Sequence, residues 1–240
     1  MTRFRFVDRQ STPHLYHWQG FNPPHLETLL RDNVIWLSRP DAFNDPWDCK
    51  PCFAMNFAND PAEMERYVKD HAEITRRHRP EIPESFILQR QREFRDNPVL
   101  LVAKATEITQ GIWAKIADRY RVYWLGPSPE NVLMWSHYAD SHRGICLEFS
   151  PRNALMCCAT QVEYCSAFPA LRLYSKSEDD NLVPLLTKAA VWSHECEYRL
   201  VAQERGGSTA HETLMKVRAA VKDAGDAVAL YAGPLAVGYD

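Results

Sequence analysis

MWSHYADSHRGICLEF, residues 134–149, is the stretch of this chain that decides its fold. Its first half has the spacing of a helix, and its second half, ICLEF, has the apolar residues of a strand. Met134 and Tyr138 are four residues apart, so they share one face of the helix, which we expect to be buried. Gly144 stands between the halves, and we expect it to end the helix in a left-handed conformation. The sequence therefore predicts a helix, a tight turn and a strand in immediate succession.

Trp135 and His137 fall on another face of this predicted helix. We expect both to line a pocket together with Tyr138, while Met134 and Ile145 belong to the core. His137 can act in that pocket as a general base or as a donor to a ligand. A histidine satisfied by partners inside the protein is the commonest situation, so the sequence leaves these three roles open.

The composition limits the class of protein. A chain of 240 residues is long enough for one large domain or two small ones, with a substantial core. The net charge of −3 provides no general attraction for nucleic acid. The sequence contains no apolar run of about twenty residues, so no membrane span is predicted. The first eighteen residues lack the apolar centre of a signal peptide. We therefore expect a cytoplasmic protein whose seven cysteines, an odd number, form no disulfide framework.

The order of predicted elements indicates an α+β fold in which small mixed or antiparallel sheets form a cleft. Near the start we expect a strand over 14–18, a helix over 22–32 and a strand over 34–38. In the second half we expect strands over 120–126, 145–149, 160–165, 197–203 and 227–233, a helix over 128–140 capped by Ser128, a helix over 179–195, and a helix-like stretch after residue 208.

Residues 60–119 differ from the rest of the chain. Asp60 and Pro61 have the types expected at the start of a helix, and similar starts recur downstream, so we predict an insert of two to four helices within a single domain spanning 1–240. The run RRHR at 76–79 is interpreted as a solvated helix end, with a nucleic-acid contact as the alternative.

The loop over 39–52, RPDAFNDPWDCKPC, is rich in residues that favour turns. Asn44 and Asp45 either fix a turn or point inward toward a ligand, and we expect both to shape the wall of a pocket. Cys49 and Cys52 form a Cys-x-Pro-Cys pair, which can exchange disulfides at the start of a helix or bind zinc with a second pair. No long helix or second pair follows at suitable spacing, so we interpret both as packed thiols and expect no metal.

The segment WSHECEYRLV, residues 192–201, contains two carboxylates two positions apart. In a strand Glu195, Glu197 and Arg199 share one face, whereas Cys196, Tyr198 and Leu200 share the opposite face, which we expect to join the core. The charged face is either an exposed surface with a weak ion pair or a pair of carboxylates at the mouth of a cleft.

Three motifs occur in a fixed order: FNDPWD at 43–48, WSHYADSHRG at 135–144 and WSHECEYR at 192–199. Together they resemble an uncharacterised bacterial domain-of-unknown-function family. That family is marked by FNDPFD-like, WxHYAxxHxG-like and WxxExExR-like blocks. The resemblance covers nearly the whole chain but implies no activity.

The order of several residue types also resembles the ADP-ribosyltransferase fold, in which NAD binds in a cleft between two small sheets. An early strand supplies Tyr16 and His17, a middle segment supplies His137 and Tyr138, and a late strand supplies Glu195 and Glu197. The resemblance implies NAD as the substrate and glycosyl transfer as the reaction. It assigns Glu197 as the key carboxylate, Glu195 as its helper, Tyr138 and His137 as further catalytic groups, and Tyr16, His17, Asn44, Asp45 and Trp135 as NAD-binding residues.

The acceptor, the oligomeric state and the biological trigger stay open. A nucleic acid, a protein or a small molecule could accept the ADP-ribose, and phage defence or a toxin–antitoxin pair is the expected setting. The alternative is a non-catalytic sensor that binds a nucleotide or a peptide in the same cleft. A hydrolase is the third hypothesis, and it would require His137 within reach of Ser136 or Cys146 as a nucleophile.

Overall fold

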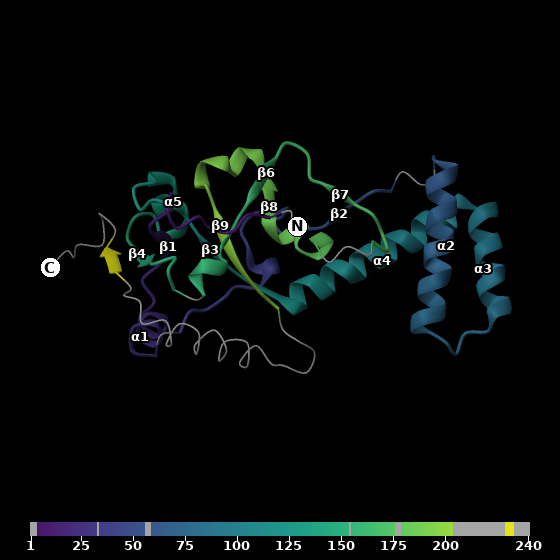
Figure 1. Ribbon diagram of the computed structural model, residues 1–240, viewed down its shortest axis with the longest axis horizontal. Coiled ribbons are helices and arrows are strands. Elements are labelled where there is room, and N and C mark those ends of the chain that lie inside the picture. Colours follow the sequence, from purple (N-terminus) through teal and green to yellow (C-terminus); the bar gives the residue numbers. More distant parts are fainter. Residues whose placement is uncertain are drawn as a thin grey trace. The chain divides into compact units, whose positions relative to one another are not determined.

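The computed structural model describes residues 4–32, 34–55, 59–153, 155–175, 179–203 and 229–232. The chain divides into two compact units (Figure 1). We call residues 1–49, 117–168 and 185–240 the sheet unit, and residues 50–116 and 169–184 the helical unit. Helices occur together with several small sheets, which confirms the predicted α+β class.

One sheet of the sheet unit contains three antiparallel strands in the order β1–β4–β10. β4, Ile145–Phe149, lies between β1, Leu15–Gln19, and β10, Ala229–Ala232. Four of the five β4 side chains are buried. Its central position therefore explains the nearly continuous apolar sequence ICLEF, and the predicted strands at 14–18 and 145–149 are confirmed.

A second antiparallel sheet has the order β3–β9–β5. β9, Tyr198–Gln203, pairs along its length with β3, Tyr120–Leu125, and at one end with β5, Thr160–Gln161. Tyr16 of β1 and Gly126, the residue after β3, exchange two backbone hydrogen bonds of 2.8 Å that link the two sheets. Residues of β1 and β3 also line the site described below.

Helices α1 and α5 pack on these strands. α1, Pro23–Asp32, places Leu26 and Leu29 in the main core with residues from both sheets. α5, Val132–Tyr138, buries Met134 against Trp18 and Cys146. Asn131, rather than the predicted Ser128, caps α5, because its side-chain oxygen accepts hydrogen bonds from the backbone N–H groups of Leu133 and Met134.

The turn between α5 and β4 differs from its prediction. Asp140, Ser141 and His142 have positive φ angles of 47°, 52° and 69°, and they form the left-handed part of the turn. Gly144 is required for a different reason: a Cβ atom there would overlap the carbonyl oxygen of Gln19 and lie 2.8 Å from the carbonyl carbon of Ala139. Glycine is thus needed at 144 because the backbone of Gln19 and Ala139 passes close to it, and not because of a positive φ angle.

Two other predictions are wrong. The segment over 34–38 forms no strand; only Ser38 pairs, through a bridge to Val122 on β3. The segment over 179–195 is not one helix, because Pro184 cannot continue a helical ladder and the following residues pair with another strand. It is divided into a 3-10 helix at Asp179–Asn181, α6 at Val183–Leu186, β8 at Thr187–Ala189 and a 3-10 helix at Ala190–Glu195.

The remaining short elements are also described. β8 pairs in parallel with β6, Glu163–Cys165, and in the helical unit β2, Cys52–Phe53, pairs in parallel with β7, Ala170–Leu171. Two further 3-10 helices lie at Pro40–Ala42 and Met156–Cys158. The helix-like stretch predicted after residue 208 lies outside the described residues.

Three helices form most of the helical unit, as the predicted insert requires. They are α2, Pro61–His78, α3, Glu84–Asp96, and α4, Pro98–Arg119. Asp60 caps α2 by accepting hydrogen bonds from the N–H groups of Ala62 and Glu63 at 3.0 and 3.2 Å. A separate core containing Tyr67, Phe94 and Leu101 holds the helices together. None of the described helices has the length and apolar character needed to cross a membrane.

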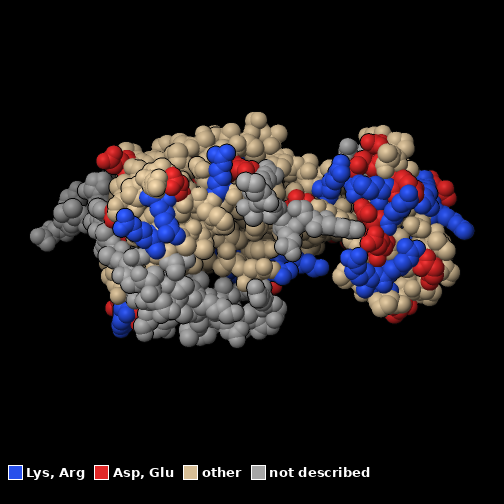
Figure 2. Space-filling view, viewed as in Figure 1, with Lys and Arg blue, Asp and Glu red and all other residues tan. Residues whose placement is uncertain are grey.

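The surface of α2 and α3 carries intermixed charges of both signs (Figure 2). Arg76 pairs with Glu84, and Arg77 pairs with Glu73, at 2.6 and 3.0 Å. The basic run at 76–79 is exposed, as its interpretation as a solvated helix end requires.

Candidate functional site

A cavity of about 290 Å³ is lined by residues of β1, α1, β3 and α5 and of the segment over 35–38. We call it the aromatic cleft, because most of its wall consists of rings. Its lining residues include His17, Trp18, His25, Trp36, Tyr123, Trp124 and Tyr138. Trp124 packs on Tyr138 with ring centroids 4.3 Å apart, and His25 stacks on Trp36 at 5.2 Å. Such walls suit a flat ring as ligand.

His17 is the polar group inside this wall of rings. Its Nδ1 lies 2.8 Å from the carbonyl oxygen of Trp124 and must therefore donate, because a carbonyl oxygen only accepts. Its ring also stacks on Tyr123 at 4.1 Å. Burial lowers the pKa of His17 to about 4, against a raising effect of the Trp124 hydrogen bond. The imidazole is thus neutral near pH 7, with a lone pair on Nε2 that can accept a hydrogen bond.

Next to the aromatic cleft lies a group of five charged side chains that we call the charged cluster. Its members are Asp48, Lys188, Glu195, Glu197 and Arg199, each no more than 4% exposed. They come from four places in the sequence: the end of the FNDPWD loop, β8, the end of a 3-10 helix, and the start of β9. The face of β9 predicted to carry charge is therefore buried and not a solvated surface.

Arg199 is at the centre of the charged cluster. Its guanidinium forms paired hydrogen bonds to Asp48, at 2.9 and 2.7 Å, and to Glu197, at 2.6 and 3.0 Å. It also donates to the carbonyl oxygen of Leu185 at 2.9 Å. Bidentate pairs of this kind are the strongest ion pairs available to a protein. Arg199 therefore fixes the two carboxylates with little freedom to move.

Lys188 is the second cation of the charged cluster, and it bonds to both glutamates. Its ammonium group donates to Glu195 through a short hydrogen bond and to Glu197 at 3.1 Å. It also lies 5.2 Å from the centre of the Trp192 ring. The second oxygen of Glu195 accepts a hydrogen bond of 2.8 Å from the hydroxyl group of Tyr138.

The three carboxylates exceed the two cations by one negative charge. Burial raises the pKa of Glu195, although Lys188 opposes the rise. Burial also acts to raise the pKa of Asp48, but the charge of Arg199 prevails and the pKa is lowered. For Tyr138, burial and the nearby Glu195 raise the pKa well above its usual range. The Tyr138 hydroxyl therefore remains a proton donor to Glu195 at any physiological pH.

Tyr138 and Trp124 connect the charged cluster to the aromatic cleft. Both line the 290 Å³ cavity, and both line a second cavity of about 20 Å³ whose wall contains the whole charged cluster. The smaller cavity has room for about one water molecule. The wall between the aromatic cleft and Glu195 thus includes the side chains of Tyr138 and Trp124.

Five of the predicted site residues line these two cavities. His17 lines the aromatic cleft, Tyr138 lines both cavities, and Glu195 and Glu197 line the smaller one. Asn44 also reaches the smaller cavity, although it is exposed and its side-chain oxygen accepts the backbone N–H of Asp45.

The other predicted site residues lie elsewhere. Asp45 accepts the backbone N–H of Trp47 at 2.9 Å and so stabilises a turn. Tyr16 packs beside Trp18 in a small core. Trp135 donates to the carbonyl oxygen of Pro129 at 2.6 Å, and it lines neither cavity. His137 is exposed, with its ring 6.2 Å from those of Tyr138 and Trp192.

The sequence did not single out Asp48 and Lys188, and it identified Arg199 only as a surface partner of Glu197. Asp48 ends the FNDPWD motif, where the earlier Asn44 and Asp45 seemed better candidates. Lys188 fell inside a helix that the structure does not contain. Cys49 is buried, and its Sγ lies 3.2 Å from a guanidinium nitrogen of Arg199. Burial raises the pKa of the Cys49 thiol, so the thiol stays protonated. Cys196, predicted to join the core, is exposed.

Comparisons with protein-family models, with curated proteins and with solved structures found no match to this chain.

Proposed function

We propose that the aromatic cleft holds the nicotinamide end of NAD, with the rest of the dinucleotide outside the cleft, and that the protein transfers ADP-ribose from NAD to a macromolecular acceptor, in the manner of an ADP-ribosyltransferase. The observation that carries this proposal is the position of Tyr138. It lies on the wall common to both cavities and donates a hydrogen bond to Glu195. A nicotinamide ring against Trp124 and Tyr138 would therefore have its ribose beside a buried carboxylate.

The reaction would need stabilisation of positive charge on that ribose. The bond between C1′ and the nicotinamide nitrogen breaks, nicotinamide leaves with the electron pair, and the acceptor adds to C1′ and loses a proton. An oxocarbenium-like transition state is positive at C1′. The charged cluster has one excess negative charge and is held rigidly, so it would stabilise that charge without reorganisation.

Glu195 is the better candidate for this carboxylate than Glu197. Both oxygens of Glu197 are bound by Arg199, and one also accepts from Lys188. Glu195 is bound by Tyr138 on one oxygen and by Lys188 on the other, and it adjoins the aromatic cleft through Tyr138. In this proposal Glu197 positions Lys188 and Arg199, while Nε2 of His17 accepts a hydrogen bond from a ribose hydroxyl group.

The first test is release of nicotinamide from NAD, followed by chromatography, with protein and nucleic-acid acceptors supplied separately. We expect release by the unaltered chain and a loss of about a hundredfold or more in Glu195→Gln, as for removal of a group that stabilises transition-state charge. Glu73→Gln, on the surface of α2, is the control. Retention of nicotinamide release in a folded Glu195→Gln variant would disprove the role of this carboxylate.

The second candidate function is a sensor that binds a nucleotide without reaction. Two observations favour it: both oxygens of Glu197 already accept hydrogen bonds from Arg199, and the cavity beside the charged cluster has a volume of only about 20 Å³. This candidate predicts that NAD raises the melting temperature while no nicotinamide appears. Absence of both effects would exclude NAD as the ligand under either candidate.

A further inference from the structure

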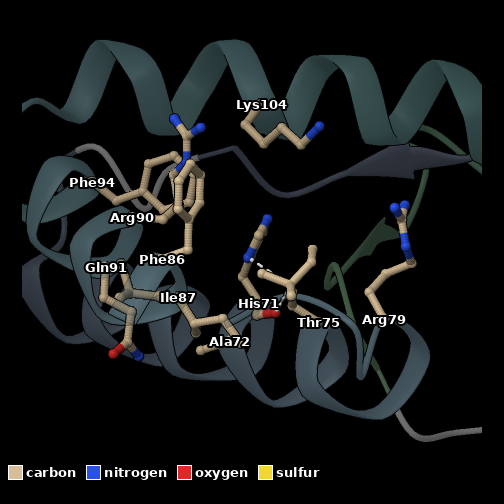
Figure 3. Close-up of a pocket in the computed structure, with 12 residues that line it drawn as sticks. His71, Ala72, Thr75, Arg79, Phe86, Ile87, Arg90, Gln91, Phe94 and Lys104 are labelled. Carbon is tan, nitrogen blue, oxygen red and sulfur yellow. Dashed lines mark hydrogen bonds between the residues drawn. The ribbon is translucent and has the colours of Figure 1, made fainter. Parts of the chain in front are cut away.

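A second cavity of about 290 Å³ lies within the helical unit, among α2, α3 and α4 (Figure 3). It is separate from the aromatic cleft and from the charged cluster, and none of its lining residues belongs to the sheet unit. Its volume is close to the lower limit for small-molecule sites. It is therefore suited to a ligand smaller than a dinucleotide.

The floor of this cavity is apolar. Val68 and Ala72 from α2, and Ile87 and Phe94 from α3, are buried in its wall. Phe86, on the turn of α3 before Ile87, is more than half exposed at the edge of the cavity. An apolar group that entered would cover the exposed Phe86 ring, which is favourable in proportion to the area removed from water.

Three cations also line this cavity. Arg79 follows α2, Arg90 lies on α3 and Lys104 lies on α4. Figure 3 shows Arg90 and Lys104 near His71, and Arg79 beyond Thr75. Among the described residues that line the cavity, none is acidic. Three positive charges from three separate segments therefore surround an apolar floor.

Each of these cations has a carboxylate partner outside the cavity lining. Arg90 pairs with Glu93 at 3.1 Å, Lys104 pairs with Glu107 at 2.8 Å, and Arg79 pairs with Glu81. These pairs are largely exposed, and exposed pairs contribute little free energy. A ligand anion could thus replace them at small cost.

His71 adds a polar group between the cations. The hydroxyl group of Thr75 donates to the His71 carbonyl oxygen at 2.8 Å, so toward Nδ1, at 3.4 Å, it can only accept. Burial, with smaller contributions from the charges of Lys104 and Arg90, lowers the pKa of His71. Figure 3 shows the ring directed from α2 toward the space between Arg90 and Lys104.

We propose that this cavity is a binding site for a small organic anion, with a carboxylate or phosphate head group among Arg79, Arg90 and Lys104 and an apolar body on the Val68–Phe94 floor. The head group and the body are both necessary. Neither an inorganic anion nor an uncharged alcohol would satisfy both parts of the wall. The proposal is independent of any reaction in the aromatic cleft.

The test is titration calorimetry on the full chain with four probes: octanoate, phenyl phosphate, inorganic phosphate and octanol. We expect octanoate or phenyl phosphate to bind at least tenfold more tightly than inorganic phosphate and octanol, and the comparison of the first two identifies the head group. Equal binding of inorganic phosphate, equal binding of octanol, or no binding by either organic anion would overturn the proposal.

Two matched lysine variants locate the site. Lys104→Gln removes a cation from the cavity wall, and we expect about tenfold weaker binding of the organic anion, as for loss of one charge-assisted hydrogen bond. Lys69→Gln removes a comparable lysine, which pairs with Glu65 on the outer surface of α2, and binding should be unchanged. An equal effect of both variants would show general charge attraction and contradict the assigned site.

Discussion

At the scale of the residue, the charged cluster is costly to bury, so each of its charged groups needs an oppositely charged partner inside the cluster. Removal of charged groups from water costs several kcal/mol each, and a buried ion pair offsets that cost only with good geometry. Arg199 supplies such geometry, with two hydrogen bonds to each of two carboxylates. The cluster is thus weak evidence for stability. It is better understood as a fixed electrostatic environment for whatever occupies the neighbouring cleft.

His17 gives a pH-dependent prediction. Its pKa is about 4 in the folded chain and 6.5 in an unfolded one, because burial disfavours the charged ring. Below pH 6.5 the unfolded state therefore binds a proton that the folded state does not. The free energy of unfolding should fall by about 3 kcal/mol as the pH is lowered from about 6.5 to about 4.

The measurement is urea unfolding across this pH range for the unaltered chain and for His17→Asn. The asparagine amide can still donate to the Trp124 carbonyl oxygen but cannot be protonated. We expect a shallower fall in the free energy of unfolding for this variant. Parallel pH profiles of the two proteins would show that His17 is not responsible.

At the scale of the element, the turn between α5 and β4 depends on one glycine. Gly144→Ala would place a methyl group against backbone atoms of Gln19 and Ala139 that cannot move aside. We expect a loss of about 3 kcal/mol in the free energy of unfolding, at the upper end for overpacking. Thermal or urea unfolding measures it.

Gly111, inside α4, provides the contrasting case. A Cβ atom there meets no described atom within 4 Å. Alanine has the higher helix propensity, so Gly111→Ala should stabilise α4 by about 0.5–1 kcal/mol. A similar loss of stability in both variants would indicate that the contacts at Gly144 are not decisive.

The elements that the sequence predicted well are those with a clear apolar pattern. ICLEF and YRVYWL are rich in apolar and aromatic residues, and they form strands whose side chains are mostly buried. Asp60 and Pro61 mark the start of α2, because Asp60 caps the helix and proline suits its first position. The segment over 179–195 was wrongly predicted as one helix, because its short runs of apolar residues fit the spacing of a helix as well as that of a strand. Pairing of β8 with β6, more than twenty residues away, decided between them.

At the scale of the whole molecule, the candidate site could be predicted only in part. Glu195 and Glu197 lie within four residues of Arg199 in the sequence, so the three groups are brought near one another locally. The hydrogen bonds between Asp48 and Arg199 join residues 151 positions apart, and no local pattern signals such a contact. The sequence left open whether the charged face is an exposed surface or the mouth of a cleft. It is part of a buried cluster, because the folded chain brings Asp48 and Lys188 to it.

The division into two units leads to the last prediction. Leu147 belongs to the core of the sheet unit, and Leu101 belongs to the core of the helical unit; both are fully buried. Leu→Ala at such sites costs about 2–5 kcal/mol. If each core stabilises its own unit, each variant should accelerate amide hydrogen exchange chiefly in the elements around the altered core, by about a hundredfold or more.

Native-state hydrogen exchange, followed by peptide mass spectrometry, measures this directly. Leu101→Ala should affect peptides from α2 and α3 and leave β4 and β9 nearly unchanged, whereas Leu147→Ala should do the reverse. Uniform acceleration across the chain in both variants would mean that the two units unfold as one. Separate responses would mean that the helical unit can change its stability, for example on binding an anion, without opening the cleft between β1 and β3.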